Sequence, residues 1–112
     1  MNEKTKKVLQ EQARFLAFCI QKAREAKSQN NWENECFYDA CIVAMKLNNG
    51  NIKNWQASAH VARRINDELL DNSRALYQSA VTEKCLTLQY FYAGIIAARN
   101  FSANQISKLC QA

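Results

Sequence analysis

Apolar residues recur at helical spacing along the first quarter of the chain. One set follows at intervals of four, three, four and three residues: Leu9, Ala13, Leu16, Ile20 and Ala23. This spacing places its members on one face of an α-helix, which we predict from about residue 5 to 28. Phe15, Phe18 and Cys19 widen the apolar face, so it is broad enough to contact more than one neighbour.

A polar break at residues 28–31 precedes a second predicted helix, from about residue 32 to 47. Asn30 or Asn31 can cap it, because an asparagine side chain accepts hydrogen bonds from free amides in the first turn. Its predicted buried face contains Trp32, Cys36, Ala40, Val43 or Ala44, and Leu47; Phe37, Cys41 and Ala44 form an adjoining stripe. We predict that the helix stops at Asn48-Asn49-Gly50-Asn51, since asparagine and glycine tolerate the left-handed conformation that ends helices.

Two longer helical segments and one short segment follow. The third helix is predicted from about residue 52 to 70, on a stripe of Ile52, Trp55, Ala59, Ala62, Ile65 and Leu69. A weak break at residues 71–73, either a turn or a kink, precedes the fourth helix, about 74–99, which Thr82-Glu83 could divide into two. Its segment 85–98 is the most hydrophobic of the chain and indicates a central helix or an oligomer face. Ser102 and Gln105 have the spacing of a capping box before a last helix at 103–110.

The composition agrees with helices joined by few turns. The 112 residues include no proline and two glycines, whereas an all-β chain of this size needs more turn residues. We predict a single all-α domain over residues 1–112, a bundle of four to five helices. Its centre is a helical hairpin at residues 30–62, with Trp32 and Trp55 as buried anchors of the two arms.

Positive charge is concentrated in the first quarter of the chain and, more thinly, in its second half. The net charge of +5 divides into +4 for residues 1–27, −2 for 28–51 and +3 for the remainder. A basic balance favours acidic partners, including nucleic acids. The candidate nucleic-acid-binding residues are Lys4, Lys6 and Lys7 of the first helix, with Arg63 and Arg64 near Trp55. Charged residues on solvated helix faces explain the same pattern more simply.

The residues that catalysis or metal binding needs are sparse. His60 is the only histidine and has no catalytic partner beside it in the sequence. The five cysteines are scattered and lack a Cys-x-x-Cys pair, so we interpret them as free thiols packed as small hydrophobes. No glycine-rich phosphate loop occurs. We therefore predict no enzyme activity, no catalytic residues, no metal and no cofactor.

The N-terminus lacks the apolar core of a signal peptide, and no apolar run approaches the length of a membrane span. We expect a cytoplasmic protein without membrane contact. The wide apolar faces of the first and fourth helices favour binding of a partner protein and also allow a homodimer. The candidate partner-binding residues are the aromatic ones on those helices: Phe15, Phe18, Tyr90, Phe91 and Tyr92.

The stretch around Trp32 is similar to known helical hairpins. Ala23-x-x-Ala26, Asn30-Asn31-Trp32 and the small residues Cys36, Ala40 and Ala44 resemble the hairpin of tetratricopeptide repeats, with the spacing out by one residue and no second copy. With Asn51, Trp55 and Arg63, residues 20–64 resemble the ANR family of small bacterial regulators, whose members lack so long a C-terminal half. That resemblance implies a negative regulator that binds AraC-type transcription activators.

These observations together predict a small regulatory or adaptor protein, of bacterial or phage accessory type, that binds a partner protein through its helix faces. The target that the resemblance favours is a transcription regulator. The alternative is a nucleic-acid-binding protein that uses the basic first helix together with Arg63 and Arg64.

Overall fold

The computed structural model describes residues 3–54 and 58–110, which form four helices and no strand. They are α1 (Glu3–Ser28), α2 (Trp32–Asn54), α3 (Ala59–Thr82) and α4 (Leu86–Cys110). The predicted all-α helical bundle is confirmed. None of the described helices is apolar over a length that could cross a membrane.

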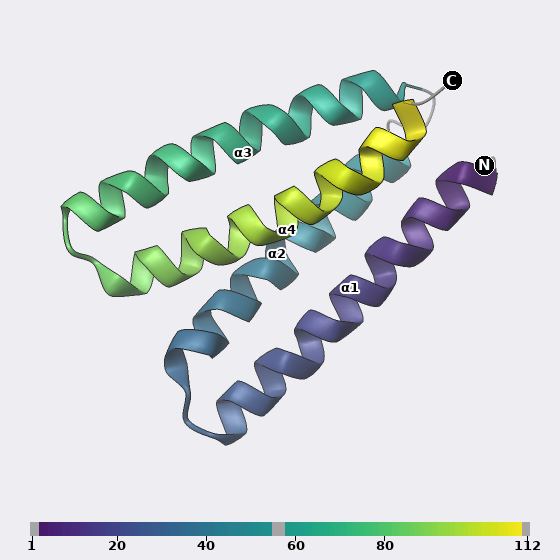
Figure 1. The fold of residues 1–112 in the computed structure, drawn as a ribbon. Coiled ribbons are helices and arrows are strands. Elements are labelled where there is room, and N and C mark those ends of the chain that lie inside the picture. The colour runs from purple at the N-terminus through teal and green to yellow at the C-terminus, as the bar shows by residue number, and fades with distance from the viewer. Residues whose placement is uncertain (1–2, 55–57, 111–112) are drawn as a thin grey trace.

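The helices form two hairpins, α1 with α2 and α3 with α4 (Figure 1). Helices α2 and α4 pack on each other at the centre, α1 packs mainly on α2, and α3 packs mainly on α4. Helices α1 and α3 do not touch, so the molecule is flat, with extents of 43 × 30 × 18 Å. The start of α1, the end of α2, the start of α3 and the end of α4 all lie at one end (Figure 1).

Both short turns lie where polar residues interrupt the pattern. At the first, Asn30 has a φ of 55°, in the left-handed region. The side chain of Asn31 accepts a hydrogen bond from the backbone N–H of Asn34 at 3.2 Å, which confirms a cap at this position. At the second, α3 ends at Thr82 and Lys84 has a φ of 58°. The predicted division at Thr82-Glu83 is therefore a real helix end.

The predicted stop at residues 48–51 is wrong, because α2 continues to Asn54 and Gly50 has no positive φ. The reason is tertiary: Asn48 is 2% exposed, and its side chain is hydrogen-bonded inside the protein. Burial and hydrogen bonding outweigh the weak helix propensity of these residues. The next helix consequently starts at Ala59 rather than Ile52, and Ile52 is a core residue of α2. Trp55 lies outside the described residues.

Two further predicted features do not occur: a turn at residues 71–73 and a helix end at residues 100–102. Helix α3 continues through residues 71–73, where the hydroxyl of Ser73 donates to the carbonyl of Leu69 at 2.8 Å. Helix α4 continues through residues 100–102, and Ser102 is fully buried instead of capping a last helix. In both places the polar side chain bonds within the fold, so the helix has no reason to end there.

The core lies along the α1–α2–α4 contacts. The deepest cluster comprises Cys19, Cys41, Ala44, Met45 and Ala98. On α2 the adjoining stripe faces this core, whereas Trp32, Val43 and Leu47 of the predicted buried face are about half exposed. On α1 the buried face also differs from the prediction, since Ala13 is exposed and Val8 is buried. Helix α2 has two adjoining apolar stripes that could each face the interior, and the packing of its neighbours buries one of them.

The thiols behave as predicted. All five cysteines are free, and Cys19 and Cys41 are buried in the core. A hydrogen bond with Cys19, together with burial, raises the pKa of the Cys41 thiol. Cys41 also donates to the carbonyl oxygen of Gly94 at 3.1 Å, where α2 and α4 approach closely. These two thiols fill space as small hydrophobic groups.

A buried polar cluster joins all four helices beside this apolar core. It contains Gln12 of α1, Asn48 of α2, Asn66 of α3, and Arg99 and Ser102 of α4. Ser102 accepts from the amides of Gln12 (3.0 Å) and Asn48 (2.9 Å), and Arg99 donates to the Asn48 oxygen at 2.8 Å. Asn66 donates to the carbonyl of Arg99 at 3.0 Å. The cluster fixes the relative register of the helices, because each bond has a specific partner.

Arg99 is unusual within this polar cluster. It is 5% exposed, and no carboxylate among the described residues forms an ion pair with it. Burial lowers the pKa of its guanidinium, because desolvation disfavours the charged form. Its Nε and the side-chain oxygen of Asn66 are buried without a hydrogen-bond partner. The guanidinium is held by the side-chain amide oxygen of Asn48 instead of an opposite charge.

Candidate functional site

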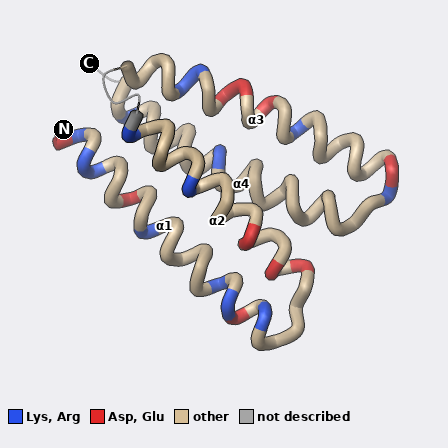
Figure 2. Tube along the Cα trace, turned by 180° about the vertical axis from the view of Figure 1, so that it is seen from behind, with Lys and Arg blue, Asp and Glu red and all other residues tan. Residues whose placement is uncertain are grey.

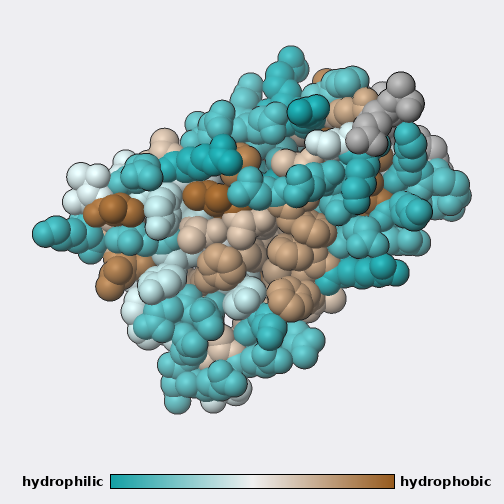
Figure 3. Space-filling view, viewed as in Figure 1, coloured by the Kyte–Doolittle hydropathy of each residue, from teal (hydrophilic) through white to brown (hydrophobic). Residues whose placement is uncertain are grey.

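The first candidate surface is an aromatic cluster formed by Phe15 and Phe18 of α1, Phe37 and Tyr38 of α2, and Phe101 of α4. The rings of Phe15 and Phe101 stack with centroids 4.2 Å apart, and Phe18 contacts Phe15 at 6.2 Å. Tyr38 meets Phe18 edge-on at 6.3 Å and Phe37 at 5.0 Å. Apolar side chains gather on this side of the molecule between α1 and α4 (Figure 3).

The outermost ring of the aromatic cluster is that of Phe18. It is 46% exposed and also lies below the ammonium of Lys22, 5.6 Å from the ring centroid. The other four rings are partly buried. Phe18 is thus a large apolar side chain on a pre-organised aromatic base, which is the character of a protein-binding anchor.

The structure does not bring the other three predicted partner-binding residues into this cluster. Tyr90, Phe91 and Tyr92 are consecutive on α4, so their side chains point about 100° apart. Tyr90 pairs edge-on with Trp32 at 5.7 Å, and Tyr92 contacts Phe91 at 5.5 Å. Phe91 lines a shallow hollow of about 450 Å³ with Trp32, Cys36 and two acidic residues of α2.

Trp32 has a different place from the one predicted. It is 47% exposed at the start of α2, where the prediction made it a buried anchor. Together with Val43 (51%) and Leu47 (56%), it leaves an apolar strip of α2 uncovered. The sequence carried a signal for this, because the two adjoining stripes of α2 are together wider than one buried helix face.

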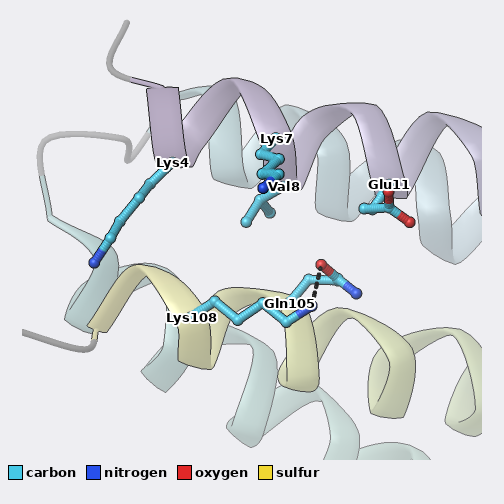
Figure 4. A pocket seen from close by; sticks show the side chains of 6 residues that line it. All are labelled: Lys4, Lys7, Val8, Glu11, Gln105 and Lys108. Atoms are coloured by element: carbon cyan, nitrogen blue, oxygen red, sulfur yellow. Dashed lines mark hydrogen bonds between the residues drawn. The ribbon is translucent and has the colours of Figure 1, made fainter.

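The second candidate surface is a basic end, where α1 begins and α4 finishes. Lys4 and Lys7 of α1 and Lys108 of α4 surround a hollow of about 370 Å³, also lined by Val8, Glu11 and Gln105 (Figure 4). Lys108 donates to the side-chain oxygen of Gln105 at 3.4 Å. Lys6 lines an adjacent hollow and pairs with Glu3 at 3.8 Å, both being well exposed.

The predicted arginines lie at this same end of the molecule, on the first turns of α3 (Figures 1 and 2). Arg63 and Arg64 are exposed, and Arg63 pairs with Asp67 at 3.9 Å. Because α1 and α3 do not touch, the arginines do not line the lysine hollow. The fold gathers the predicted basic residues at one end but not into one groove.

The described residues offer little for catalysis. They contain no group of three or more histidine, cysteine or acidic residues that could hold a metal ion. His60 is exposed at the start of α3. Burial, followed by the charges of Asp39 and Glu35, raises the pKa of Cys36, which works against a thiolate nucleophile there.

Comparison with known proteins returned no similarity to this chain. No protein-family model matches the sequence, and neither a curated protein nor a solved structure matches it.

Proposed function

We propose that this protein is a non-enzymatic regulatory or adaptor protein that binds a partner protein through the aromatic cluster of α1, α2 and α4. The observation that carries the proposal is the exposed ring of Phe18 on a stacked aromatic base. Exposed aromatic anchors on a rigid base lose little side-chain entropy on binding, so they are favoured at protein interfaces.

The kind of partner follows from the chemistry of this surface. The aromatic cluster is apolar, and the two cations nearest to it on α1, Lys22 and Arg14, are paired with Glu25 and Glu11. A helix that presents an apolar face would match it. The similarity of residues 20–64 to the ANR regulators favours a transcription activator as that partner.

Photo-crosslinking tests the proposal directly. A photoreactive residue at position 18 should capture a defined protein from the producing organism, whereas the same residue at position 76 should not. Leu76 is a matched control, because it lies on α3 and is 47% exposed, against 46% for Phe18. With the purified partner, Phe18→Ala is expected to weaken binding by about tenfold or more, and Leu76→Ala to leave it unchanged.

The circular-dichroism spectrum of each variant checks the fold in that experiment. Identical adducts from positions 18 and 76, or full affinity in a folded Phe18→Ala variant, would remove the aromatic cluster as the binding surface.

A second candidate function, nucleic-acid binding, is favoured by the gathering of Lys4, Lys7 and Lys108 around one hollow. Such binding should weaken steeply with salt, because each phosphate contact releases a counterion. The Lys7→Ala/Lys108→Ala variant should lower the slope of log K against log salt by about two for a duplex DNA of about 20 base pairs. Arg74→Ala, at an exposed position of α3 away from the hollow, is the control for charge alone. An absence of DNA and RNA binding at low salt would exclude this candidate.

A further inference from the structure

Helix α2 has a stripe of residues along its outer side that α4 touches only at its N-terminal end, where Trp32 meets Tyr90 and Cys36 donates to the carbonyl of Thr87. Positions at alternating spacings of four and three run along its outer side: Trp32, Cys36, Asp39, Val43, Lys46, Gly50 and Lys53. All are exposed except Cys36, which is half-buried, and Leu47, 56% exposed, lies beside them. We call this stripe, with Glu35 and Leu47 at its margins, the outer face of α2. Spacings of four and three are those of a helix that packs along another helix.

The charges on this face are separated by sign. Glu35 and Asp39 lie in the N-terminal half of α2, and Lys46 and Lys53 lie in the C-terminal half, a separation visible along the helix in Figure 2. None of the four is in an ion pair within the described part of the chain. The pairs that do occur there join residues three or four positions apart on α1 and on α3. Among the described helices, α2 is therefore the one that carries both acidic and basic residues but has no ion pair between them.

This arrangement is self-complementary about its midpoint. Two copies of α2 aligned antiparallel about Val43 place residue i of one copy opposite residue 86 − i of the other. Asp39 then faces position 47 of the other copy, one residue from Lys46, and Glu35 faces position 51, two residues from Lys53. Val43 meets its own counterpart on the two-fold axis, with Leu47 beside it. The two helix dipoles also run in opposite directions, which is favourable.

We infer that the outer face of α2 is an interface between two copies of this chain, which pair antiparallel about a two-fold axis at Val43. Two-fold symmetry makes every contact occur twice, so a self-complementary face is the form that such a dimer requires. The exposed apolar side chains of Val43 and Leu47 supply the buried centre, and the charges fix the direction and register. This inference is independent of the aromatic cluster and of its partner.

A charge-exchange experiment on the full chain tests the pairing. Analytical ultracentrifugation should show a concentration-dependent dimer for the wild type. Asp39→Lys places lysine against lysine at both symmetry-related contacts, and Lys46→Glu places acid against acid. Each single variant should therefore raise the dimer Kd by about tenfold or more. Val43→Glu, with two carboxylates on the axis, should abolish the dimer.

Mixing the two single variants gives the decisive result. In a mixed dimer both contacts are of opposite sign, so an equimolar mixture of Asp39→Lys and Lys46→Glu should regain the wild-type Kd, as should the double variant. This rescue distinguishes contact between copies from an effect of Arg24 and Lys27, which line a hollow with Glu35 and Asp39 in the same chain. All altered positions are exposed, so the variants should fold as the wild type does.

Glu68→Lys, at an exposed position of α3, is the control for net charge and should not change the Kd. A wild type that stays monomeric up to about 1 mM would overturn the inference. So would a dimer that the single variants leave unchanged, or single variants that fail to rescue each other in the mixture.

Discussion

Gly94→Ala is expected to destabilise the fold by about 3 kcal/mol or more, and to lower the Tm by roughly 10 °C or more. A Cβ at this position would overlap the carbonyl oxygen of Phe37 and lie 3.0 Å from the Cβ of Ala40. The clashing atom belongs to the backbone of α2, so no side chain can rotate away. Helices α2 and α4 would have to separate, with loss of the bond from Cys41 to the Gly94 carbonyl. Urea and thermal unfolding measure the change.

Gly50→Ala is the matched control for the glycine on α2. It is also helical, but an added Cβ there would meet nothing within 4 Å, and its φ is not positive. Alanine should raise stability by about 0.5–1 kcal/mol, through the lower conformational entropy of the unfolded chain. Both variants should be compared at one low protein concentration, so that self-association does not contribute. If the two substitutions changed the free energy of unfolding equally, this result would contradict a close contact at Gly94.

The hydrophobic pattern was sufficient for the fold class and the first short turn, and it marked the second turn only as a possible division of one helix. The left-handed residues Asn30 and Lys84 each lie in a run of polar residues that the pattern marks as a break. Turns of this kind are local, because the residues that make them are neighbours in the sequence. The candidate surfaces were predicted less well, because exposure depends on which helices become neighbours.

The wrong predictions have one physical origin. Asn48 and Ser102 are polar, so each was assigned to a helix end, yet both are buried inside helices. Their hydrogen bonds join residues 51 to 90 positions apart, which no local pattern reveals. The same holds for Trp32, whose exposure depends on α3 packing against α4 and leaving the side of α2 open. Long-range contacts determine whether these residues are buried or exposed, and the spacing of residues in the sequence does not reveal those contacts.

The two proposed interfaces can operate together. Phe37 and Tyr38, which carry the aromatic cluster on α2, are six and five positions from Val43, or about 120–140° around the helix. A dimer formed through the outer face of α2 would therefore leave both aromatic clusters free. Such a dimer would be bivalent, and a dimeric partner would then bind it more tightly than the single contact implies. The monomeric Val43→Glu variant would lose that additional affinity while keeping its own aromatic cluster.

The polar cluster gives the second large expected effect, at Ser102. Its hydroxyl is fully buried and accepts from two amides, those of Gln12 on α1 and Asn48 on α2. Ser102→Ala removes the acceptor for both and should destabilise the protein by about 2–4 kcal/mol, because each buried unsatisfied donor costs roughly 1–3 kcal/mol. The Gln12 amide keeps a hydrogen bond to the side-chain oxygen of Asn49 at 3.2 Å. Most of the lost stability therefore comes from the Asn48 amide, which is left without its acceptor.

Ser107→Ala separates this effect from the simple loss of a hydroxyl on α4. Ser107 donates only to the carbonyl of Ala103 within its own helix, so its replacement should change stability by about 0.5 kcal/mol or less. A double-mutant cycle of Gln12→Leu with Ser102→Ala then measures the bond between α1 and α4, with an expected coupling of about 1 kcal/mol or more. Zero coupling, or a loss at Ser102 no larger than that at Ser107, would mean that packing alone sets the helix register. A measured coupling would instead show that Ser102, a residue whose sequence context favours a helix start, holds three helices in place from inside α4.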